Sequence, residues 1–308
     1  MVWRFSRLYA KGRTQQSETF IGANDSISNT ANVCDIPVTH AEQANDAYAL
    51  PENIQQLQRD AVLHYLLRTL LKGNYRIPIQ APQHILDIGC GSGIWCRDLA
   101  HQFPQAHIYG IDLTNSRPVS SANVHFIAGQ TPQELPFQEN SFDFIHQRFL
   151  AYSLQPRQWP GLLNHMHRVA RHGAWIEFVE GASEYCTPSG PANTQLADGL
   201  SQLAGQRGLD IDLINRLDTL INPALFVNMK KEQFSLPLGN WAGLMGTLMA
   251  RECLTYIADQ KNAFLEDLGY TARQFDSIAQ TVTAEWETLH STITINVIYA
   301  QVKKESRY

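Results

Sequence analysis

The sequence HILDIGCGSG at residues 84–93 decides the fold of this chain. Its first half is mostly apolar and is typical of a short buried β-strand. An acid lies near the end of the strand, and three alternating glycines follow it: Asp87, then Gly89, Gly91 and Gly93. Because glycine has no Cβ, such a turn lets the backbone pass very close to a bound ligand. The stretch therefore predicts a strand, a ligand-binding turn and a helix.

A second apolar run at residues 107–111 ends in another acid, Asp112. Asp112 comes nineteen residues after Gly93, where a nucleotide-binding βαβ unit places the carboxylate that binds ribose hydroxyls. The dinucleotide pattern G-x-G-x-x-G would put its third glycine at Ile94, one residue later than in this chain. We therefore expect a nucleoside ligand without a diphosphate; the alternative is a tight turn whose glycines are only structural.

Apolar runs and helical patterns alternate along the segment that follows. Strands are expected at 84–88, 107–111, 124–127, 142–147 and 173–179, with helices at 93–102 and 158–171 and a short one near 131–134. This alternation is typical of right-handed βαβ crossovers and predicts a doubly wound, mainly parallel α/β sheet. Ligands of such sheets bind beyond the carboxyl ends of the strands, where the glycine turn and Asp112 both fall.

Several pieces of the chain resemble class I S-adenosylmethionine-dependent methyltransferases, whose fold is Rossmann-like. The resemblance is carried by residues 85–93, 109–113, 135–137, 140–144, 145–148 and 168–177. The last two pieces, and AYALPEN at residues 47–53, are most similar to the subgroup that contains the fungal LaeA-like enzymes and related natural-product methyltransferases. The resemblance is good over residues 45–185 and loose in the C-terminal third.

This resemblance implies a site for S-adenosylmethionine. The implied cofactor-binding residues are Asp87, Gly89, Cys90, Gly91, Gly93, Asp112, Leu113, Gln130 and Gln147. Asp112 would accept hydrogen bonds from both ribose hydroxyls, Leu113 would flank the adenine, and Cys90 would contribute its backbone. The family usually has a Gly-Asp pair after the third strand, and this chain has Gly129-Gln130 instead. Gln130 is therefore expected to bind the adenine amino group more weakly than an acid would.

Methyl transfer from a sulfonium is an in-line displacement, in which alignment and exclusion of water do most of the work. His146, Gln147 and Arg148 follow the fourth strand and are expected to face the donor methyl. The candidate catalytic residues are His146, as a base, and Glu180, which with Glu177 lies near the end of the fifth strand. Either glutamate would orient a polar acceptor. The alternatives are a hydrogen-bonded histidine and solvent-facing carboxylates.

The remaining segments are mostly helical in pattern. Helices are expected at 52–72, 193–206, 210–221 and over most of 241–288, with strands at 233–236 and 292–302. We expect an N-terminal flap or lid at 1–50, a cofactor-binding core at 51–185, a mainly helical cap and insertion at 186–290, and a closing strand of the core at 291–308. The insertion would lie beside the carboxyl edge of the sheet and cap the acceptor pocket. Tyr152, Tyr185 and Trp241 are candidates to line that pocket, or else to pack in the core.

The composition limits the size of the fold, the kinds of substrate and the state of the cysteines. A chain of 308 residues that is 44% hydrophobic is long enough for a core domain with a cap. A net charge of −5 offers no general attraction for phosphate backbones, which disfavours nucleic-acid substrates. Five scattered cysteines without a C-x-x-C pair favour reduced thiols in the cytoplasm.

The sequence disfavours a metal site and a membrane-spanning helix. His165 and His167 lie two residues apart on a predicted helix, so they point in different directions and do not share a metal ion. No apolar run reaches about 18 residues, so no membrane-spanning helix is expected.

The sequence therefore predicts an enzyme that transfers a methyl group from S-adenosylmethionine to a small hydrophobic or aromatic acceptor, such as a secondary metabolite. One alternative is a cofactor-binding regulatory protein of the LaeA-like kind. Another is a methyltransferase that acts on protein or RNA, and a variant is methylation that triggers cyclisation of a polyene. The N-terminal segment would serve as a lid or as a contact in a homo-oligomer. Whether oxygen, nitrogen or carbon is methylated has no residue signature, because positioning alone does the catalysis.

The substitution Asp112→Ala is expected to weaken cofactor affinity by about 1–3 kcal/mol, because two charge-assisted hydrogen bonds are lost. Isothermal titration calorimetry with S-adenosylmethionine measures the effect. An unchanged affinity would remove Asp112 from the predicted site.

Overall fold

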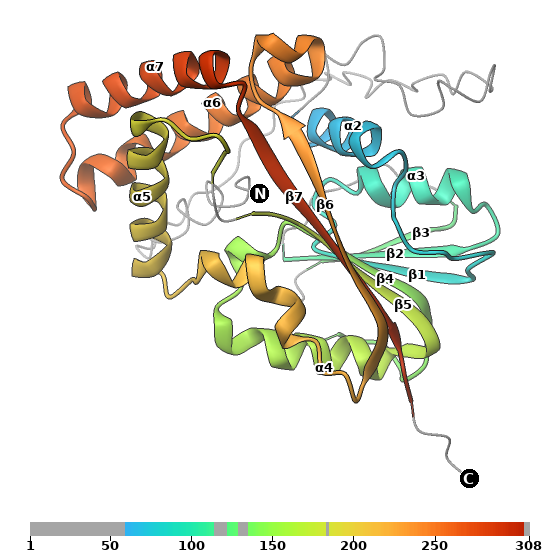
Figure 1. The fold of residues 1–308 in the computed structure, drawn as a ribbon. Helices are drawn as coiled ribbons and strands as arrows, with labels where there is room; N and C mark the ends of the chain where they lie inside the picture. Colours follow the sequence, from blue (N-terminus) through green and yellow to red (C-terminus); the bar gives the residue numbers. More distant parts are fainter. Residues whose placement is uncertain (1–58, 114–121, 129–134, 183–184, 305–308) are drawn as a thin grey trace, which may run out of the picture.

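A seven-stranded sheet forms the centre of the computed structural model, which describes residues 59–113, 122–128, 135–182 and 185–304 (Figure 1). The strands are β1 (His84–Ile88), β2 (His107–Asp112), β3 (Val124–Ala128), β4 (Phe142–Arg148), β5 (Ala170–Gly181), β6 (Phe226–Pro237) and β7 (Thr292–Val302). Their order is β3-β2-β1-β4-β5-β7-β6, with β7 antiparallel to both of its neighbours and the first five strands parallel. This arrangement confirms the predicted doubly wound, mainly parallel sheet.

Helices cover both faces of the sheet. On one face lie α2 (Arg59–Leu71) and α3 (Ile94–Gln102), and on the other lies α4 (Trp159–Val169) (Figure 1). Helix α2 packs on the sheet through an apolar stripe, in which Val62, Leu63, Leu66 and Leu67 are buried. Each face has its own hydrophobic cluster, one built around Phe144 and the other around Ile145. These two neighbours on β4 point to opposite faces, as the two-residue period of a strand requires.

The helices α5 (Pro191–Gln206), α6 (Gly243–Glu266) and α7 (Ala272–Leu289) lie at one end of the sheet and are called the cap helices here (Figure 1). The 3₁₀ helix η4 (Ile211–Leu220) buries Leu213, Ile214 and Leu217 in the cluster around Ile145. Gly181, the last residue of β5, pairs with Ile295 near the start of β7, and β7 follows α7 directly. The insertion of α6 and α7 between β6 and β7 therefore leaves and rejoins the sheet at the edge where the parallel strands end (Figure 1).

The structure differs from the sequence expectations in two elements. Strand β6 is twelve residues long rather than four, because its polar residues 230–233 hide the strand pattern while the backbone pairs with β7. The helical stretch at 241–288 is two helices: Gly269 has a φ of 74°, and Thr271 then caps α7 in a reciprocal pair with Gln274. Residues 1–58 and 129–134, where the lid and a short helix were expected, lie outside the described residues.

None of the described helices combines the length and the apolar content that crossing a bilayer requires.

Gly199 allows α5 and α6 to pack closely, because a Cβ at this position would lie 2.3 Å from the ring of Phe264. The substitution Gly199→Ala is therefore expected to destabilise the fold by about 1–3 kcal/mol through overpacking. Gly205 on the same helix is the matched control, since a Cβ there meets nothing within 4 Å. Gly205→Ala is expected to stabilise the helix by about 0.5–1 kcal/mol. Urea unfolding curves of the two variants compare these effects, and equal midpoints would contradict the packing argument.

Candidate active site

The glycine turn joins β1 to α3 at the carboxyl edge of the sheet. Gly89, Gly91 and Gly93 have φ values of 76°, 57° and 73°, in the left-handed region where other residues are strained. The N–H groups of Gly89 and Cys90 donate to the carbonyl oxygen of Ile111, at 2.7 and 3.1 Å. The backbone conformation of the turn therefore requires glycine at these three positions. Its hydrogen bonds attach it to the end of β2.

Asp112, at the end of β2, also holds the turn through a hydrogen bond. Its Oδ2 accepts a hydrogen bond from the Gly91 N–H at 2.8 Å, and the residue is buried. A carboxylate has about four lone-pair sites, so holding the turn is compatible with binding ribose hydroxyls as well. The next residue, Leu113, is 53% exposed. The two residues expected to bind ribose and adenine thus lie together beside the turn.

Gly110 is a part of the site that the sequence reasoning missed. A Cβ on Gly110 would lie 2.9 Å from both the Cys90 sulfur and the Phe126 ring. The turn therefore packs down onto β2 at a residue without a side chain. A glycine inside an apolar strand indicates such a close approach, and this signal was present in the sequence. The left-handed turn, this close packing and the carboxylate at the end of β2 fit a nucleoside cofactor.

Asp87 and His146 pair across β1 and β4 and are both buried. The His146 Nδ1 lies 2.9 Å from the Asp87 Oδ1, and the Cys96 thiol donates to the Asp87 Oδ2 at 3.5 Å. The imidazole stacks on the Trp95 ring, with centroids 3.9 Å apart and planes at 6°. Burial lowers the pKa of His146, although the hydrogen bond and the charge of Asp87 oppose this shift. A neutral His146 therefore donates from Nδ1 to Asp87.

This geometry favours the hydrogen-bonded alternative for His146 over the base that the sequence led us to consider. The imidazole is held between Asp87 and Trp95 on the face of the sheet that α3 covers. Its contacts orient the acid that precedes the glycine turn. His146 is therefore placed to orient the Asp87 carboxylate.

Glu180 and Gln147, at the ends of β5 and β4, are also fully buried. The Glu180 Oε1 accepts hydrogen bonds from the Gln147 Nε2 at 3.0 Å and from the backbone N–H groups of Leu150 and Ala151 at 2.8 and 3.2 Å. Burial raises the pKa of Glu180 to about 7, against the effect of these hydrogen bonds. The Glu180 Oε2 has no hydrogen-bond partner among the described residues. Glu180 thus holds the segment after β4 that continues into the 3₁₀ helix η2 (Ala151–Ser153).

Glu177 lies deeper in β5 than Glu180 and is also buried. It lies four residues before the end of β5, and its Oε2 accepts the Arg76 N–H at 2.6 Å. Burial raises its pKa to about 8. Glu177 therefore anchors the segment between α2 and β1. Gln130 lies outside the described residues.

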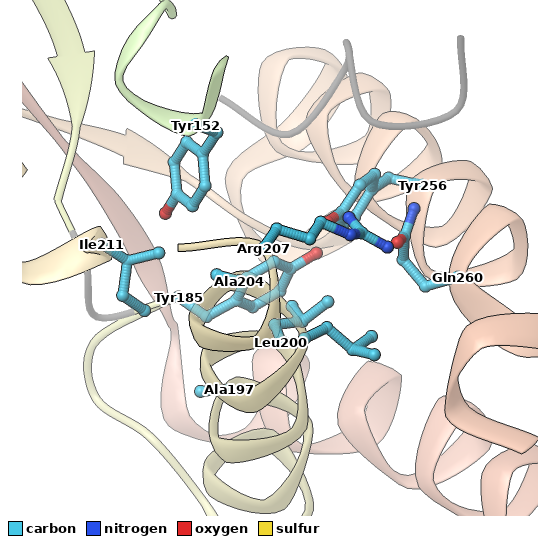
Figure 2. A pocket seen from close by; sticks show the side chains of 10 residues that line it. Tyr152, Tyr185, Ala197, Leu200, Ala204, Arg207, Ile211, Tyr256 and Gln260 are labelled. Carbon is cyan, nitrogen blue, oxygen red and sulfur yellow. The ribbon is translucent and has the colours of Figure 1, made fainter. Parts of the chain in front are cut away.

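A narrow cavity opens between η2 and the cap helices (Figure 2). Its lining residues are Tyr152, Tyr185, Ala197, Leu200, Leu203, Ala204, Arg207, Ile211, Tyr256 and Gln260. Its volume of about 20 Å³ holds roughly one water molecule in this conformation. Two of the three aromatic residues proposed from the sequence, Tyr152 and Tyr185, line it. The third, Trp241, instead stacks on His290 with ring centroids 4.8 Å apart.

Comparisons with known proteins show the family to which this chain belongs. A family model described as a methyltransferase domain matches residues 55–218. Methyltransferase pytC from Aspergillus terreus is 26% identical over 272 residues, which cover 83% of each chain. The secondary metabolism regulator laeA from Aspergillus fumigatus is 33% identical over 137 residues, which cover 43% of this chain and 36% of that protein.

The fold itself recurs in a solved structure. A protein from an antibiotic biosynthesis pathway of Anabaena variabilis superposes with a TM-score of 0.52 at 15% identity, covering 78% of this chain and 96% of that one. The family match spans more than half of the chain and includes the glycine turn, Asp112 and the ends of β4 and β5. The chain therefore belongs to the methyltransferase-domain family, and it is a class I S-adenosylmethionine-dependent methyltransferase related to the LaeA-like proteins.

Proposed function

We propose that this enzyme methylates a small hydrophobic or aromatic acceptor in secondary metabolism. The observation that carries the proposal is the cavity beyond the ends of β4 and β5, with its tyrosines and the apolar side chains of α5. A narrow, mostly apolar cavity favours a small organic molecule over a protein or RNA strand. The printed names of the relatives, a methyltransferase and a secondary metabolism regulator, support the metabolic setting.

The cofactor is proposed to bind over the glycine turn. In this proposal Gly89, Gly91 and Gly93 admit its amino-acid and ribose parts, Cys90 contributes backbone, Asp87 reaches the ammonium through water, Asp112 binds the ribose hydroxyls and Leu113 flanks the adenine. The left-handed glycines and the buried carboxylates at this edge support the assignment. The bound cofactor supplies a sulfonium methyl whose leaving group is a neutral thioether.

The chain's own contribution is mainly alignment. Glu180, through the Leu150 and Ala151 N–H groups, holds the segment that carries Tyr152 at the cavity. Because catalysis needs only an aligned donor and acceptor in a dry site, fixing this segment is the main task. Where the acceptor must lose a proton, the Glu180 Oε2 is the proposed base, because the pKa of about 7 allows it to take a proton at neutral pH. Gln147 then orients the Glu180 carboxylate rather than contacting the cofactor.

A regulatory role is the second candidate, and the similarity to laeA over 137 residues favours it. The two candidates differ in whether any small molecule receives the methyl group. They do not differ in cofactor binding, so binding alone does not separate them.

Incubation of the full chain with methyl-labelled S-adenosylmethionine and a metabolite extract is expected to place label in organic-soluble small molecules. Protein and RNA fractions incubated in parallel are expected to stay unlabelled. Asp112→Ala serves as the control, since weaker cofactor binding should lower all label transfer. Label found only in protein or RNA, or in no fraction although the cofactor binds, would overturn the small-molecule assignment.

The role of His146 is tested by His146→Phe, which keeps an aromatic ring against Trp95 and removes the hydrogen bond to Asp87. Cofactor affinity is expected to fall by about 1–3 kcal/mol, because the buried Asp87 loses a donor. His146→Gln retains a side-chain N–H and is expected to recover part of the loss. Calorimetry with S-adenosylhomocysteine and measurement of kcat separate the two roles: a normal affinity with a collapsed kcat would restore His146 as a base.

A further inference from the structure

A wide groove lies over β5, β7 and β6, on the face of the sheet that α2 covers. Its volume is about 500 Å³, within the range of small-molecule sites. Tyr299 of β7 is four residues from Ile295, which pairs with Gly181 at the carboxyl edge, so the groove lies away from the proposed cofactor and acceptor sites. The residues that line it are Arg76, Pro78, Trp175, Asn228, Met229, Lys230, Glu232 and Tyr299.

A β-bulge in β6 forms one wall of the groove. Residues 227–230 of β6 lie opposite residues 299–301 of β7, so β6 contains one more residue than its partner over this stretch. Within the bulge, Asn228 has a φ of 54°, and its side-chain amide donates to the Gln301 side chain at 2.9 Å. Met229 beside it is 46% exposed. Bulges redirect side chains and are over-represented next to active sites, so this wall is a specific feature of the strand.

Strand β6 is the outermost strand of the sheet, but this stretch is a poor template for an added strand (Figure 1). The bulge interrupts the pairing pattern, and Lys230 and Lys231 place positive charge on the strand. Both features discourage an edge from pairing with another chain. The groove therefore favours a small molecule over a docked peptide strand.

Lys230 gives the groove a net positive charge. Glu232 accepts hydrogen bonds from the Arg76 Nε at 3.0 Å and from the Tyr299 hydroxyl at 2.7 Å, so Arg76 balances its charge. The Lys230 ammonium makes no hydrogen bond or ion pair with any residue that the structure describes. In a chain with a net charge of −5, this local excess of positive charge favours a ligand with one negative group.

Two aromatic rings form most of the apolar surface of the groove. Trp175 and Tyr299 contact each other edge to face, with ring centroids 6.0 Å apart and planes at 63°. Tyr299 is buried, whereas Trp175 is only partly buried and leaves ring area for a further contact. Aromatic rings gain from stacked and edge-to-face contacts beyond the area they bury, so the groove fits a flat aromatic ring.

We propose that this groove is a second binding site, for a flat aromatic carboxylic acid whose ring packs on Trp175 and whose carboxylate pairs with Lys230. Hydrogen bonds between an ammonium and a carboxylate are stronger than those between neutral groups. The site is separate from the proposed acceptor site and does not depend on which molecule is methylated. Arg76 and Pro78 belong to the segment that leads into β1, so the bound acid contacts both the sheet and the chain that precedes the glycine turn.

Three probes of similar size separate the two features of the ligand. 2-Naphthoate has the ring and the charge, 2-naphthamide has only the ring, and decahydro-2-naphthoate has only the charge. They are titrated by calorimetry at low salt into the full chain saturated with S-adenosylhomocysteine. 2-Naphthoate is expected to bind about fivefold more tightly than either of the others, which is the size of a partly exposed ion pair or a ring contact.

Three variants locate the binding. Lys230→Met keeps an extended side chain without the charge, and it is expected to bring the ratio of naphthoate to naphthamide affinity close to one. Trp175→Leu is expected to bring the ratio of naphthoate to decahydronaphthoate affinity close to one. Lys231→Met is the matched control: Lys231 pairs with Asp218 at 3.0 Å and does not line the groove, so both ratios are expected to stay unchanged.

If 2-naphthoate does not bind, if Lys230→Met keeps the preference for the charged probe, or if both lysine variants lose it equally, the groove is not the proposed site. Lys230 is exposed, so its variant decides the question even where Trp175→Leu fails to fold. The affinity for S-adenosylhomocysteine reports folding and is expected to stay unchanged. Failure of label transfer to every metabolite, together with a preference that depends on Lys230, would overturn the proposed function and leave this site intact.

Discussion

The contact between the glycine turn and the end of β2 is the constraint on which the site depends. Three backbone N–H groups of the turn, from Gly89, Cys90 and Gly91, are taken up by the Ile111 carbonyl and the Asp112 carboxylate. Gly110 allows this approach because it has no side chain beneath Cys90. The contact fixes the start of α3, and through Trp95 it also fixes the imidazole that orients Asp87. The hydrogen bonds that hold the turn on β2 therefore also shape the proposed cofactor site.

Several buried polar side chains lie at the carboxyl edge of the sheet. Without hydrogen-bond partners, such side chains would destabilise the fold. Burying a carboxyl group costs free energy unless hydrogen bonds compensate it. Asp87 is compensated by His146, and Glu180 by Gln147 and two backbone N–H groups. Asp87 and His146 join the neighbouring strands β1 and β4, and Glu180 joins β5 to the segment that follows β4. The cap helices lie beyond this edge, where the acceptor is proposed to bind.

Much of the fold was predictable from local sequence. The five parallel strands contain apolar runs, and the glycine turn with Asp112 marks the cofactor edge in the sequence itself. Strand β6 was mostly missed, because its residues 230–233 are polar and only pairing with β7 makes them a strand. The role of His146 was also open, since a histidine at a strand end has the same sequence signature whether it is a base or a partner of Asp87.

The sequence by itself determined the sheet, the turn and the class of cofactor, because alternating burial and the φ requirements of glycine are local properties of the chain. Only the tertiary structure decided which buried groups meet. Tyr152, Arg207 and Gln260 come from three separate elements, and no spacing along the chain indicates that they line one cavity. The shape of this cavity depends on how α5 and α6 pack beyond the strands, and that packing involves long-range contacts such as that of Gly199 with Phe264.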